Sequence, residues 1–234
     1  MKICLAQINP VVGDIHGNAK RMITIIKKIR ADIVVFPELS VTGYSPQDLL
    51  LKHDFIDENI GALARIAQNT KNKSAIVGYI DRKNGFLQNS AAIIRDQRII
   101  KVHNKICLPN YAIFDEKRWF KEGDEATIFN FDGKIIGISI CEDIWLPETT
   151  KIQKEKGAEL IINISASPYR KGKIEAVEKV LEQRWEENRI PMVFVNQVGA
   201  QDGIVYYGHS MYFNNGKVIK KCKDFDEDSL IIDF

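Results

Sequence analysis

The sequence predicts a single α/β domain, and two observations support this fold class. Short runs rich in Ile and Val, typical of buried strands, alternate with segments whose apolar residues recur at helical spacing. The chain has 234 residues, 45% of them hydrophobic, which is enough for a sizeable core. Length alone would also allow two small domains, but no repeat and no Pro-, Gly- or Ser-rich linker divides the chain. We therefore expect one domain over residues 1–234.

The first part of the chain is expected to alternate between strands and helices. Residues 2–9 predict the first strand, and the apolar pattern over 22–29 predicts the helix that follows it. A short strand over 32–36 then ends at a proline, which places Glu38 just beyond the strand end. Apolar residues at helical spacing over 56–67 indicate a second helix.

The middle of the chain predicts a strand hairpin followed by a long loop. Three strands are expected here, at residues 74–80, 87–95 and 98–103. Asp96 and Gln97 form the tight turn between the last two strands, and Lys105 follows the hairpin directly. Residues 106–124 show no regular pattern, and a loop of that length inside a compact domain is often functional.

The second half of the chain predicts further strands around one helix. The helix is expected over 173–188, after a polar loop over 165–172, and an Asn-Asn-Gly turn at 214–216 joins two late strands. Polar side chains follow several of these strands, and in α/β sheets such side chains line the crevice where ligands bind. The strands are expected at residues 127–131, 134–140, 160–164, 192–196, 210–213, 218–221 and 230–232.

Charge and cysteine content exclude several classes of function. The formal net charge is +2 and charges of both signs are mixed, so we expect neither nucleic acid nor a membrane as a partner. The apolar start over residues 3–8 is too short for a secretory signal. The four cysteines show no Cys-x-x-Cys pair and the four histidines no metal-ligand spacing, which favours a reducing cytoplasm and argues against a metal site. No Gly-rich phosphate-binding motif follows a strand.

Cys141 is the leading candidate for a catalytic nucleophile. The apolar run over 135–140 brings it to a strand end, where acidic and aromatic residues follow and Pro147 prevents the strand from continuing. An inert core cysteine, the ordinary alternative, would usually have apolar residues on both sides. Cys107 is a rival nucleophile, but a Leu-Pro pair follows it and it lacks the change from strand to polar residues.

Glu38 and Lys105 have the chemistry to assist a thiol at Cys141. A thiol is mostly protonated at neutral pH, so its attack on a carbonyl needs a nearby base, and Glu38 could be that base. Lys105, with the backbone N–H after Cys141, would stabilise the oxyanion that the attack creates. By residue type alone, both side chains could equally be solvated on the surface.

Three motifs resemble those of the nitrilase, or carbon–nitrogen hydrolase, superfamily, whose members use a Glu, Lys and Cys triad. They are FPELSVTGY at residues 36–44, KICLP at 105–109 and ICEDIW at 140–145. Their order and separation also agree with the family, and the resemblance covers essentially the whole chain. It implies an α-β-β-α sandwich of the nitrilase type, a homo-oligomer, and catalysis by Glu38, Lys105 and Cys141 without a metal or organic cofactor.

Further motifs are similar to the amide-hydrolysing domain of glutamine-dependent NAD synthetases. They are LPNY at residues 108–111, FDE at 114–116, SASPY at 165–169 and GK at 172–173. The resemblance implies that the substrate is glutamine and that Tyr111, Ser167 and Lys173 hold it. It also implies that Glu116, grouped with these binding residues, is the family's supplementary acidic residue beside the lysine. Ordinary loop hydrogen bonds and a surface charge at a helix start are the alternatives for these residues.

Full synthetases of this kind also carry an adenylating domain with a Ser-Gly-Gly-x-Asp-Ser pyrophosphate loop, and this sequence has none. We therefore expect either a fragment of a longer protein or a free-standing subunit that passes ammonia to an NAD synthetase partner. Two other functions stay open. One is a general amidase that shares the triad but acts on another small amide, and the other is a non-catalytic assembly module that keeps the fold.

Overall fold

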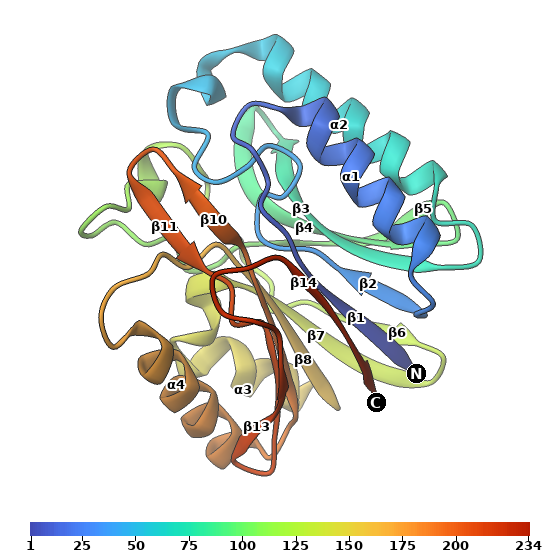
Figure 1. Cartoon of the computed structure of the whole chain (residues 1–234), viewed down its shortest axis with the longest axis vertical. Coiled ribbons are helices and arrows are strands. Elements are labelled where there is room, and N and C mark those ends of the chain that lie inside the picture. Colours follow the sequence, from blue (N-terminus) through green and yellow to red (C-terminus); the bar gives the residue numbers. More distant parts are fainter.

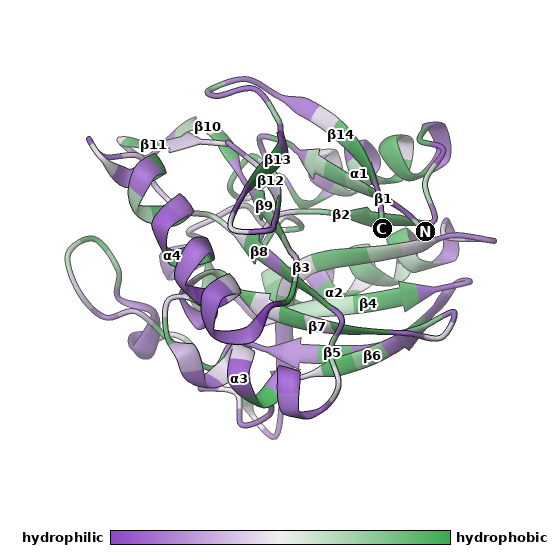
Figure 2. Ribbon diagram, turned by 90° about the horizontal axis from the view of Figure 1, so that it is seen from below, coloured by the Kyte–Doolittle hydropathy of each residue, from purple (hydrophilic) through white to green (hydrophobic).

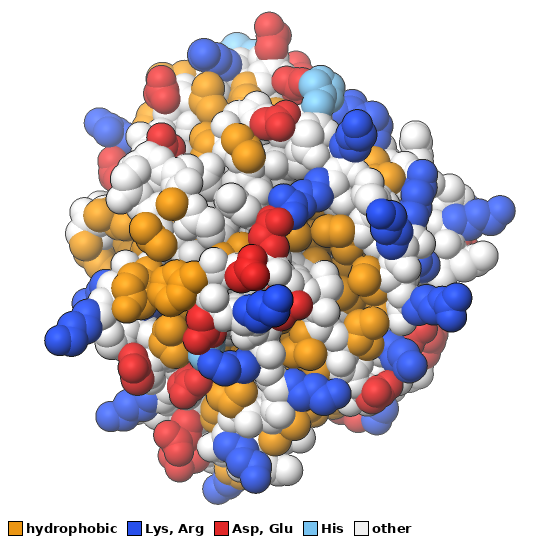
Figure 3. All heavy atoms as spheres, viewed as in Figure 1, with side chains coloured by type: hydrophobic (Ala, Val, Ile, Leu, Met, Phe, Trp, Pro, Cys, Tyr) orange, Lys and Arg blue, Asp and Glu red, His pale blue; other side chains and the backbone are white.

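Two six-stranded sheets pack face to face, and a pair of helices covers the outer face of each (Figure 1). A computed structural model describes all of residues 1–234. The α-β-β-α sandwich expected from the sequence is confirmed. Lysine, arginine and acidic side chains are mixed over the face seen in Figure 3, in keeping with the small net charge. None of the helices is both long enough and apolar enough to cross a membrane.

The first sheet holds both ends of the chain. Its strands are β1 (Lys2–Gln7), β2 (Ile33–Val35), β3 (Ser74–Lys83), β4 (Phe86–Arg95), β5 (Arg98–Asn104) and β14 (Asp228–Asp233). They lie in the order β14-β1-β2-β3-β4-β5, and only the neighbours among β1, β2 and β3 are parallel. The amino group of Met1 donates to the carbonyl oxygen of Phe234 at 2.8 Å, so the two termini lie side by side (Figure 1).

The second sheet has the same layout, with a parallel centre and antiparallel edges. Its strands are β6 (Ile128–Phe131), β7 (Lys134–Ile140), β8 (Leu160–Ser165), β9 (Met192–Asn196), β12 (Met211–Asn214) and β13 (Lys217–Lys221). They lie in the order β13-β12-β9-β8-β7-β6. A separate two-stranded ribbon consists of β10 (Val198–Gln201) and β11 (Ile204–Tyr207).

Four α-helices form the two outer layers (Figure 1). They are α1 (Ile15–Lys28) and α2 (His53–Gln68) over the first sheet, and α3 (Pro147–Glu155) and α4 (Lys173–Asn188) over the second. Helix α1 begins where the side chain of Asp14 accepts a hydrogen bond from the backbone N–H of Gly17 at 2.9 Å, which caps its first turn. Three short 3-10 helices are η1 (Gln47–Leu51), η2 (Glu116–Arg118) and η3 (Cys141–Ile144).

The predicted strands and helices are present, most of them within a few residues of their expected bounds, but helix α1 begins earlier than its apolar pattern, at Ile15. Helix α3 and the ribbon of β10 and β11 were not predicted. Helix α3 is mostly polar, so its sequence shows no apolar periodicity, and only Pro147 at its first position marks its start. The short ribbon of β10 and β11 also lacks a clear alternating pattern. The predicted hairpin turn is confirmed, since Asp96 and Gln97 both have positive φ, as a type I′ turn requires.

The central strands are buried on both faces, which explains their nearly continuous apolar sequences (Figure 2). In β1, Ile3 and Leu5 join the apolar layer between the sheets, while Cys4 and Ala6 face the layer under α1 and α2. A third apolar layer lies between the second sheet and its helices, and includes Leu181 of α4. Burial of each large aliphatic side chain contributes about 1.5–3 kcal/mol, so these layers fix the strand ends on which the functional residues lie.

Candidate active site

Glu38 lies three residues after the end of β2 and is completely buried. Its Oε1 accepts hydrogen bonds from Nζ of Lys105 at 2.7 Å and from Nδ2 of Asn89 at 2.8 Å. Its Oε2 accepts from the backbone N–H of Ala166 at 2.8 Å, and Ala166 follows β8 of the second sheet. One carboxylate therefore connects the two sheets at the ends of their central strands.

Gly78 on β3 allows the chain around Glu38 to pass close to the sheet. A Cβ at Gly78 would lie 2.4 Å from the carbonyl oxygen of Pro37 and 2.4 Å from the backbone nitrogen of Leu39. The carbonyl of Gly78 also accepts from the backbone N–H of Val41 at 3.1 Å. Only a residue without a side chain fits this approach, so Gly78 helps to set the position of Glu38.

Lys105 directly follows β5 and is 1% exposed. Its backbone N–H donates to the carbonyl of Asn89 at 2.8 Å, and its own carbonyl accepts from Gly123 at 2.8 Å. Its Nζ contacts carboxylates of both Glu38, at 2.7 Å, and Glu116, at 2.8 Å. Burial alone would lower the pKa of Lys105, but Glu116 and Glu38 outweigh burial and hold that pKa well above its ordinary value. Lys105 is therefore a fixed ammonium at this position.

Glu116 is buried at the start of η2 and shares the ammonium of Lys105 with Glu38. Its Oε1 also accepts a hydrogen bond from the hydroxyl of Tyr44 at 2.7 Å, while its Oε2 has no partner. Burial raises the pKa of Glu116 to about 7, with Lys105 lowering it and Glu38 raising it further. One ammonium cannot compensate two buried carboxylates in full, and the raised pKa of Glu116 reflects this.

Cys141 follows β7 directly, is 6% exposed, and begins η3 with a φ of +45°. Such a left-handed conformation costs a residue with a side chain roughly 1–3 kcal/mol and persists only where surrounding contacts hold it. Burial and the charge of Glu38 raise the pKa of the Cys141 thiol well above its ordinary value, while Lys105 acts in the opposite direction. The thiol of Cys141 is thus protonated, and its charged neighbours include Glu38, Lys105 and Glu116. We call Glu38, Lys105, Glu116 and Cys141 the buried cluster.

Cys107 lies outside the buried cluster. It is only partly buried, and its acidic neighbours are Asp143 and Glu142 rather than Glu38. Burial and Asp143 raise the pKa of the Cys107 thiol to about 12, and Lys105 has the weakest influence on it. Of the two thiols, Cys141 is therefore the one that has Glu38 among its charged neighbours together with Lys105.

Four side chains of mixed polarity lie outside the buried cluster but close to Cys141. The hydroxyl of Tyr111 donates to the carboxylate of Glu142, at 3.0 and 3.1 Å from its two oxygens. Nζ of Lys173 lies 3.9 Å from the centroid of the Trp145 ring. Burial lowers the pKa of Lys173, and Cys141 and Glu142 both act against that lowering. We call Tyr111, Glu142, Trp145 and Lys173 the outer set.

Ser167 follows Ala166 in the loop after β8 and is 3% exposed. Its backbone N–H donates to Oδ1 of Asn196 at 2.8 Å, and Nδ2 of Asn196 reaches the Ser167 carbonyl at 3.4 Å. Asn196 is the last residue of β9, so the loop after β8 is fixed to the end of the neighbouring strand. The loop that carries Ser167 also carries Ala166, which bonds Glu38.

Several residues of this region were not among those predicted from the sequence. Glu142 and Trp145 are the immediate neighbours of Cys141 in its motif, so the motif itself could have indicated them. Tyr44 ends the motif around Glu38 and could have been found in the same way. Asn89 lies in the middle of a strand, and no sequence pattern distinguishes it from other polar strand residues.

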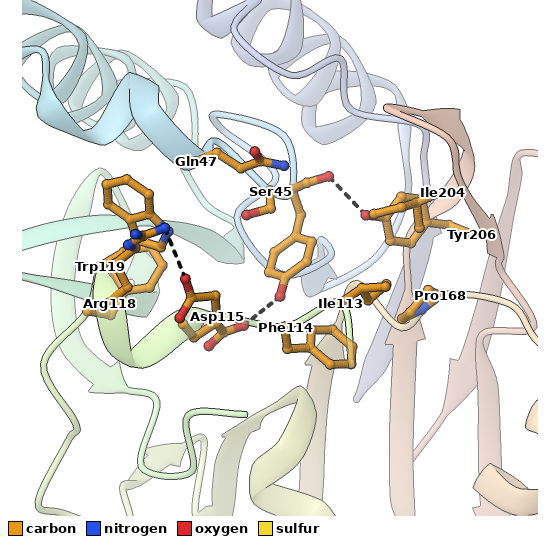
Figure 4. Close-up of a pocket in the computed structure, with 13 residues that line it drawn as sticks. Ser45, Gln47, Ile113, Phe114, Asp115, Arg118, Trp119, Pro168, Ile204 and Tyr206 are labelled. Carbon is orange, nitrogen blue, oxygen red and sulfur yellow. Dashed lines mark hydrogen bonds and ion pairs between the residues drawn. The ribbon is translucent and has the colours of Figure 1, made fainter. Parts of the chain in front are cut away.

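A cavity of about 180 Å³ borders the buried cluster at Glu116 (Figure 4). Glu116 is the one member of the buried cluster among its lining residues, which also include Tyr44, Phe114, Trp119 and Tyr206. The hydroxyl of Tyr206 donates to the carbonyl of Tyr44 at 3.1 Å, closing one side. No group of three or more His, Cys, Asp or Glu side chains could hold a metal ion.

Comparison with known proteins gives one family over the whole chain. The sequence profile of the carbon–nitrogen hydrolases matches residues 2–234. Two similar relatives are glutamine-dependent NAD(+) synthetases, from Thermotoga maritima and Aquifex aeolicus, each 38% identical over 241 and 237 residues. These alignments cover 100% and 99% of this chain but 42% of each relative, so the chain spans less than half of their length.

Solved structures give the same picture. A glutamine-dependent NAD+ synthetase from Acinetobacter baumannii superposes with a TM-score of 0.94 at 36% identity, covering 98% of this chain and 44% of that one. An amidase from Nesterenkonia sp. superposes with a TM-score of 0.88, covering 100% of this chain and 90% of that one. The amidase is only 19% identical, so that likeness concerns the fold.

Proposed function

This chain belongs to the carbon–nitrogen hydrolase family, and we propose that it hydrolyses the side-chain amide of glutamine to glutamate and ammonia. The observation that carries the proposal is the buried cluster, in which a thiol, a base and a fixed ammonium gather at strand ends of both sheets. Glutamine is favoured as the substrate because relatives matched over the whole chain are glutamine-dependent NAD synthetases.

The first half of the reaction forms a thioester on Cys141. Glu38 takes the proton of the thiol, and the sulfur attacks the carbonyl carbon of the glutamine side chain. The carbonyl oxygen becomes an oxyanion, which the ammonium of Lys105 stabilises. The intermediate then collapses, the carbon–nitrogen bond breaks, and Glu38 returns its proton to the departing nitrogen, so that ammonia leaves. A buried, permanently charged Lys105 suits this role because it needs no rearrangement during the step.

The second half releases glutamate. Glu38 takes a proton from a water molecule, and the resulting hydroxide attacks the thioester carbonyl. Lys105 again stabilises the oxyanion, the carbon–sulfur bond breaks, and the sulfur of Cys141 receives the proton held by Glu38. The two halves of the reaction use the same base, which fits a carboxylate whose orientation is fixed by Lys105, Asn89 and the Ala166 N–H.

The outer set has the charges that glutamine recognition requires. Free glutamine carries an α-carboxylate and an α-ammonium, beyond the amide that reacts. Lys173 is a cation for the carboxylate, and Glu142, already paired with the Tyr111 hydroxyl, is an anion for the ammonium. Ser167 directly follows Ala166, whose backbone N–H bonds Glu38, so Ser167 would contribute to substrate binding as well. A simple aliphatic amide would offer no opposite charge to either Lys173 or Glu142, so the outer set favours glutamine over the general amidase alternative.

The proposed use of the ammonia is NAD synthesis. Relatives that this chain matches over 42% of their length are NAD synthetases, so the acceptor would be a synthetase domain or subunit acting on adenylated nicotinic acid dinucleotide. The family resemblance also favours assembly of the chain into a homo-oligomer, and the cysteine usage favours a reducing cytoplasm. Co-purification with an adenylating domain, and sedimentation of the pure protein, would test these two points.

The test of the activity is ammonia release from glutamine by the wild type and two matched variants. We expect Cys141→Ala to be inactive and Cys107→Ala to retain activity close to that of the wild type. An electrophilic glutamine analogue should label Cys141, as mapped by peptide mass spectrometry. Activity that survives in Cys141→Ala would refute the assignment. Absence of both ammonia release and labelling in the wild type would favour a non-catalytic assembly module.

Substrate choice is tested with glutamine, asparagine and ω-amides that lack the α-amino and α-carboxyl groups. Glutamine should have the highest kcat/KM, because only it presents both charges at the correct distance from the amide. A higher kcat/KM for an uncharged amide would support the general amidase instead.

A further inference from the structure

The carboxylate of Asp143 joins the two chain segments that carry Lys105 and Cys141. Its Oδ1 accepts from the backbone N–H groups of Ile106, at 3.0 Å, and Cys107, at 2.8 Å. Its Oδ2 accepts from the backbone N–H of Ile140 at 2.9 Å. Asp143 is completely buried, so these bonds are not weakened by water. Each carboxylate oxygen thus binds a different segment.

Two of these donors are immediate neighbours of proposed catalytic residues in the chain. Ile106 directly follows Lys105, and Ile140 directly precedes Cys141. Lys105 follows β5 of the first sheet, whereas Cys141 follows β7 of the second. No backbone hydrogen bonds of either sheet connect these two strands, so side chains must set the separation of the ammonium and the sulfur.

His103 completes the connection from the side of β5. Its Nε2 lies 3.0 Å from Oδ2 of Asp143, and because a carboxylate only accepts, Nε2 is the donor. Its Nδ1 lies 3.2 Å from the hydroxyl oxygen of Thr127, just before β6. The imidazole is completely buried, and each of its ring nitrogens has a hydrogen-bond partner. The pair therefore binds strand β5, the turn at Cys141 and the segment that enters β6.

We propose that Asp143, oriented by His103, is a positioning residue that sets the distance between the Lys105 ammonium and the Cys141 sulfur. The proposal rests on the proposed function, since it concerns the same reaction. Asp143 does not touch the substrate and exchanges no proton in the mechanism. Asp143 accepts from the backbone N–H of Ile140, which precedes the left-handed residue Cys141, and from that of Ile106, which follows Lys105.

The principal test is Asp143→Asn, which keeps the shape but replaces one acceptor oxygen by an NH₂ group. One of the two segments then loses its bond and can shift. We expect kcat with glutamine to fall by roughly 30- to 100-fold, the range that a displacement of about 1 Å produces. The rate of Cys141 alkylation by iodoacetamide should have its pH midpoint shifted upward, because a displaced Lys105 stabilises the thiolate less.

Variants of His103 keep the proposal testable if Asp143→Asn does not fold. His103→Gln places an amide N–H near the position of Nε2 and should retain most of the activity and the wild-type alkylation profile. His103→Phe removes the donor and should show the same upward shift as Asp143→Asn. A folded Asp143→Asn, or a folded His103→Phe, with wild-type kcat and alkylation profile would overturn the proposal.

Asn59→Ala is the control for a purely structural effect. The Asn59 side chain is also completely buried and bonds the backbone of Ile80 at 2.6 and 3.2 Å, but it lies in α2, away from the buried cluster. It should lower the melting temperature without moving the alkylation profile. Failure of the wild type to use glutamine would contradict the proposed function, while the alkylation experiment, which needs no glutamine, would still decide the role of Asp143.

Discussion

Members of the buried cluster and of the outer set are neighbours in the chain around Lys105 and Cys141, yet the two groups are built in opposite ways. Lys105 is 1% exposed and lies between two carboxylates, with its backbone bonded on both sides. Tyr111 is 55% exposed, and its hydroxyl contacts one partly exposed carboxylate, that of Glu142. Glu38, Lys105 and Cys141 follow strand ends of the two sheets, and Glu116 lies in η2, whereas the outer set lies on the loop after β5, the turn after β7 and the start of α4.

The difference indicates a division between chemistry and recognition. Buried charges without water interact strongly, so changes in the cluster should alter both folding stability and the rate of the chemical step. Partly exposed charges are screened, so changes in the outer set should alter substrate binding and leave stability nearly unchanged. Four substitutions test this division, three of them by comparing stability with kinetics and one, at Glu116, by the dependence of stability on pH.

Lys105→Met should have the largest effect. It leaves the carboxylates of Glu38 and Glu116 buried together without their cation. We expect the free energy of unfolding to fall by about 3–5 kcal/mol, and kcat to fall by about 10²–10³-fold through loss of oxyanion stabilisation. Urea unfolding and ammonia release measure the two effects.

Lys101→Met, on the strand β5 that precedes Lys105, is the matched control. Lys101 has a side chain 40% exposed and pairs with Glu125 only at 3.6 Å. Its loss should change stability by less than about 0.5 kcal/mol and leave kcat unchanged. Equal losses of stability in the two variants would show that the ion pairs of the buried cluster contribute no more to stability than an ion pair on the surface.

Glu116 should make stability depend on pH. Its folded pKa of about 7 lies above its ordinary value of 4.5, so between these values the folded protein holds a proton that the unfolded chain releases. The contribution of Glu116 to stability is therefore fully present below pH 4.5 and is lost as the pH rises to about 7. Over this pH range, the free energy of unfolding of the wild type should fall by about 3 kcal/mol relative to that of Glu116→Gln. Denaturant unfolding of both proteins from pH 4.5 to 7.5 would measure it, and parallel curves would contradict the shift.

Gly78→Ala tests whether backbone packing places Glu38. The added Cβ would lie 2.4 Å from backbone atoms on either side of Glu38, so the chain there must move. We expect a loss of about 1–3 kcal/mol of stability together with a lower kcat. In Gly61→Ala, on α2, the nearest atom to the new Cβ is the far end of Arg65 at 3.7 Å, so this control should stabilise the protein slightly. A normal kcat in folded Gly78→Ala would show that Glu38 tolerates the displacement.

The same division explains what the sequence could predict. Glu38, Lys105 and Cys141 directly follow strand patterns or lie within three residues of them, so hydrophobic periodicity located their positions at the ends of strands. The contact of Glu116 with Lys105 could not be derived in this way, because residues 106–124 have no periodicity and only the family resemblance indicated it.

Buried polar contacts within strands were the hardest to predict. Asn89 bonds Glu38 and His103 bonds Asp143. Each lies in a strand whose sequence does not show whether a polar side chain faces solvent or the interior. Their partners are 51 and 40 residues away in the chain. The strand order of the first sheet brings Asn89 to Glu38, and the packing of the two sheets brings His103 to Asp143. Local sequence patterns carry no information about such pairs.

Lys173→Met should have the smallest effect on stability and a clear effect on binding. Lys173 is partly exposed at the start of α4, and its ammonium lies against the Trp145 ring rather than in a buried ion pair. A lost charge-assisted contact with the α-carboxylate should raise KM for glutamine by roughly 10- to 100-fold, with kcat changed far less. Lys171→Met, an exposed lysine two residues earlier, should leave both constants unchanged. If Lys173→Met instead lowered kcat at constant KM, Lys173 would act in the chemical step, and the division between cluster and outer set would have to be redrawn.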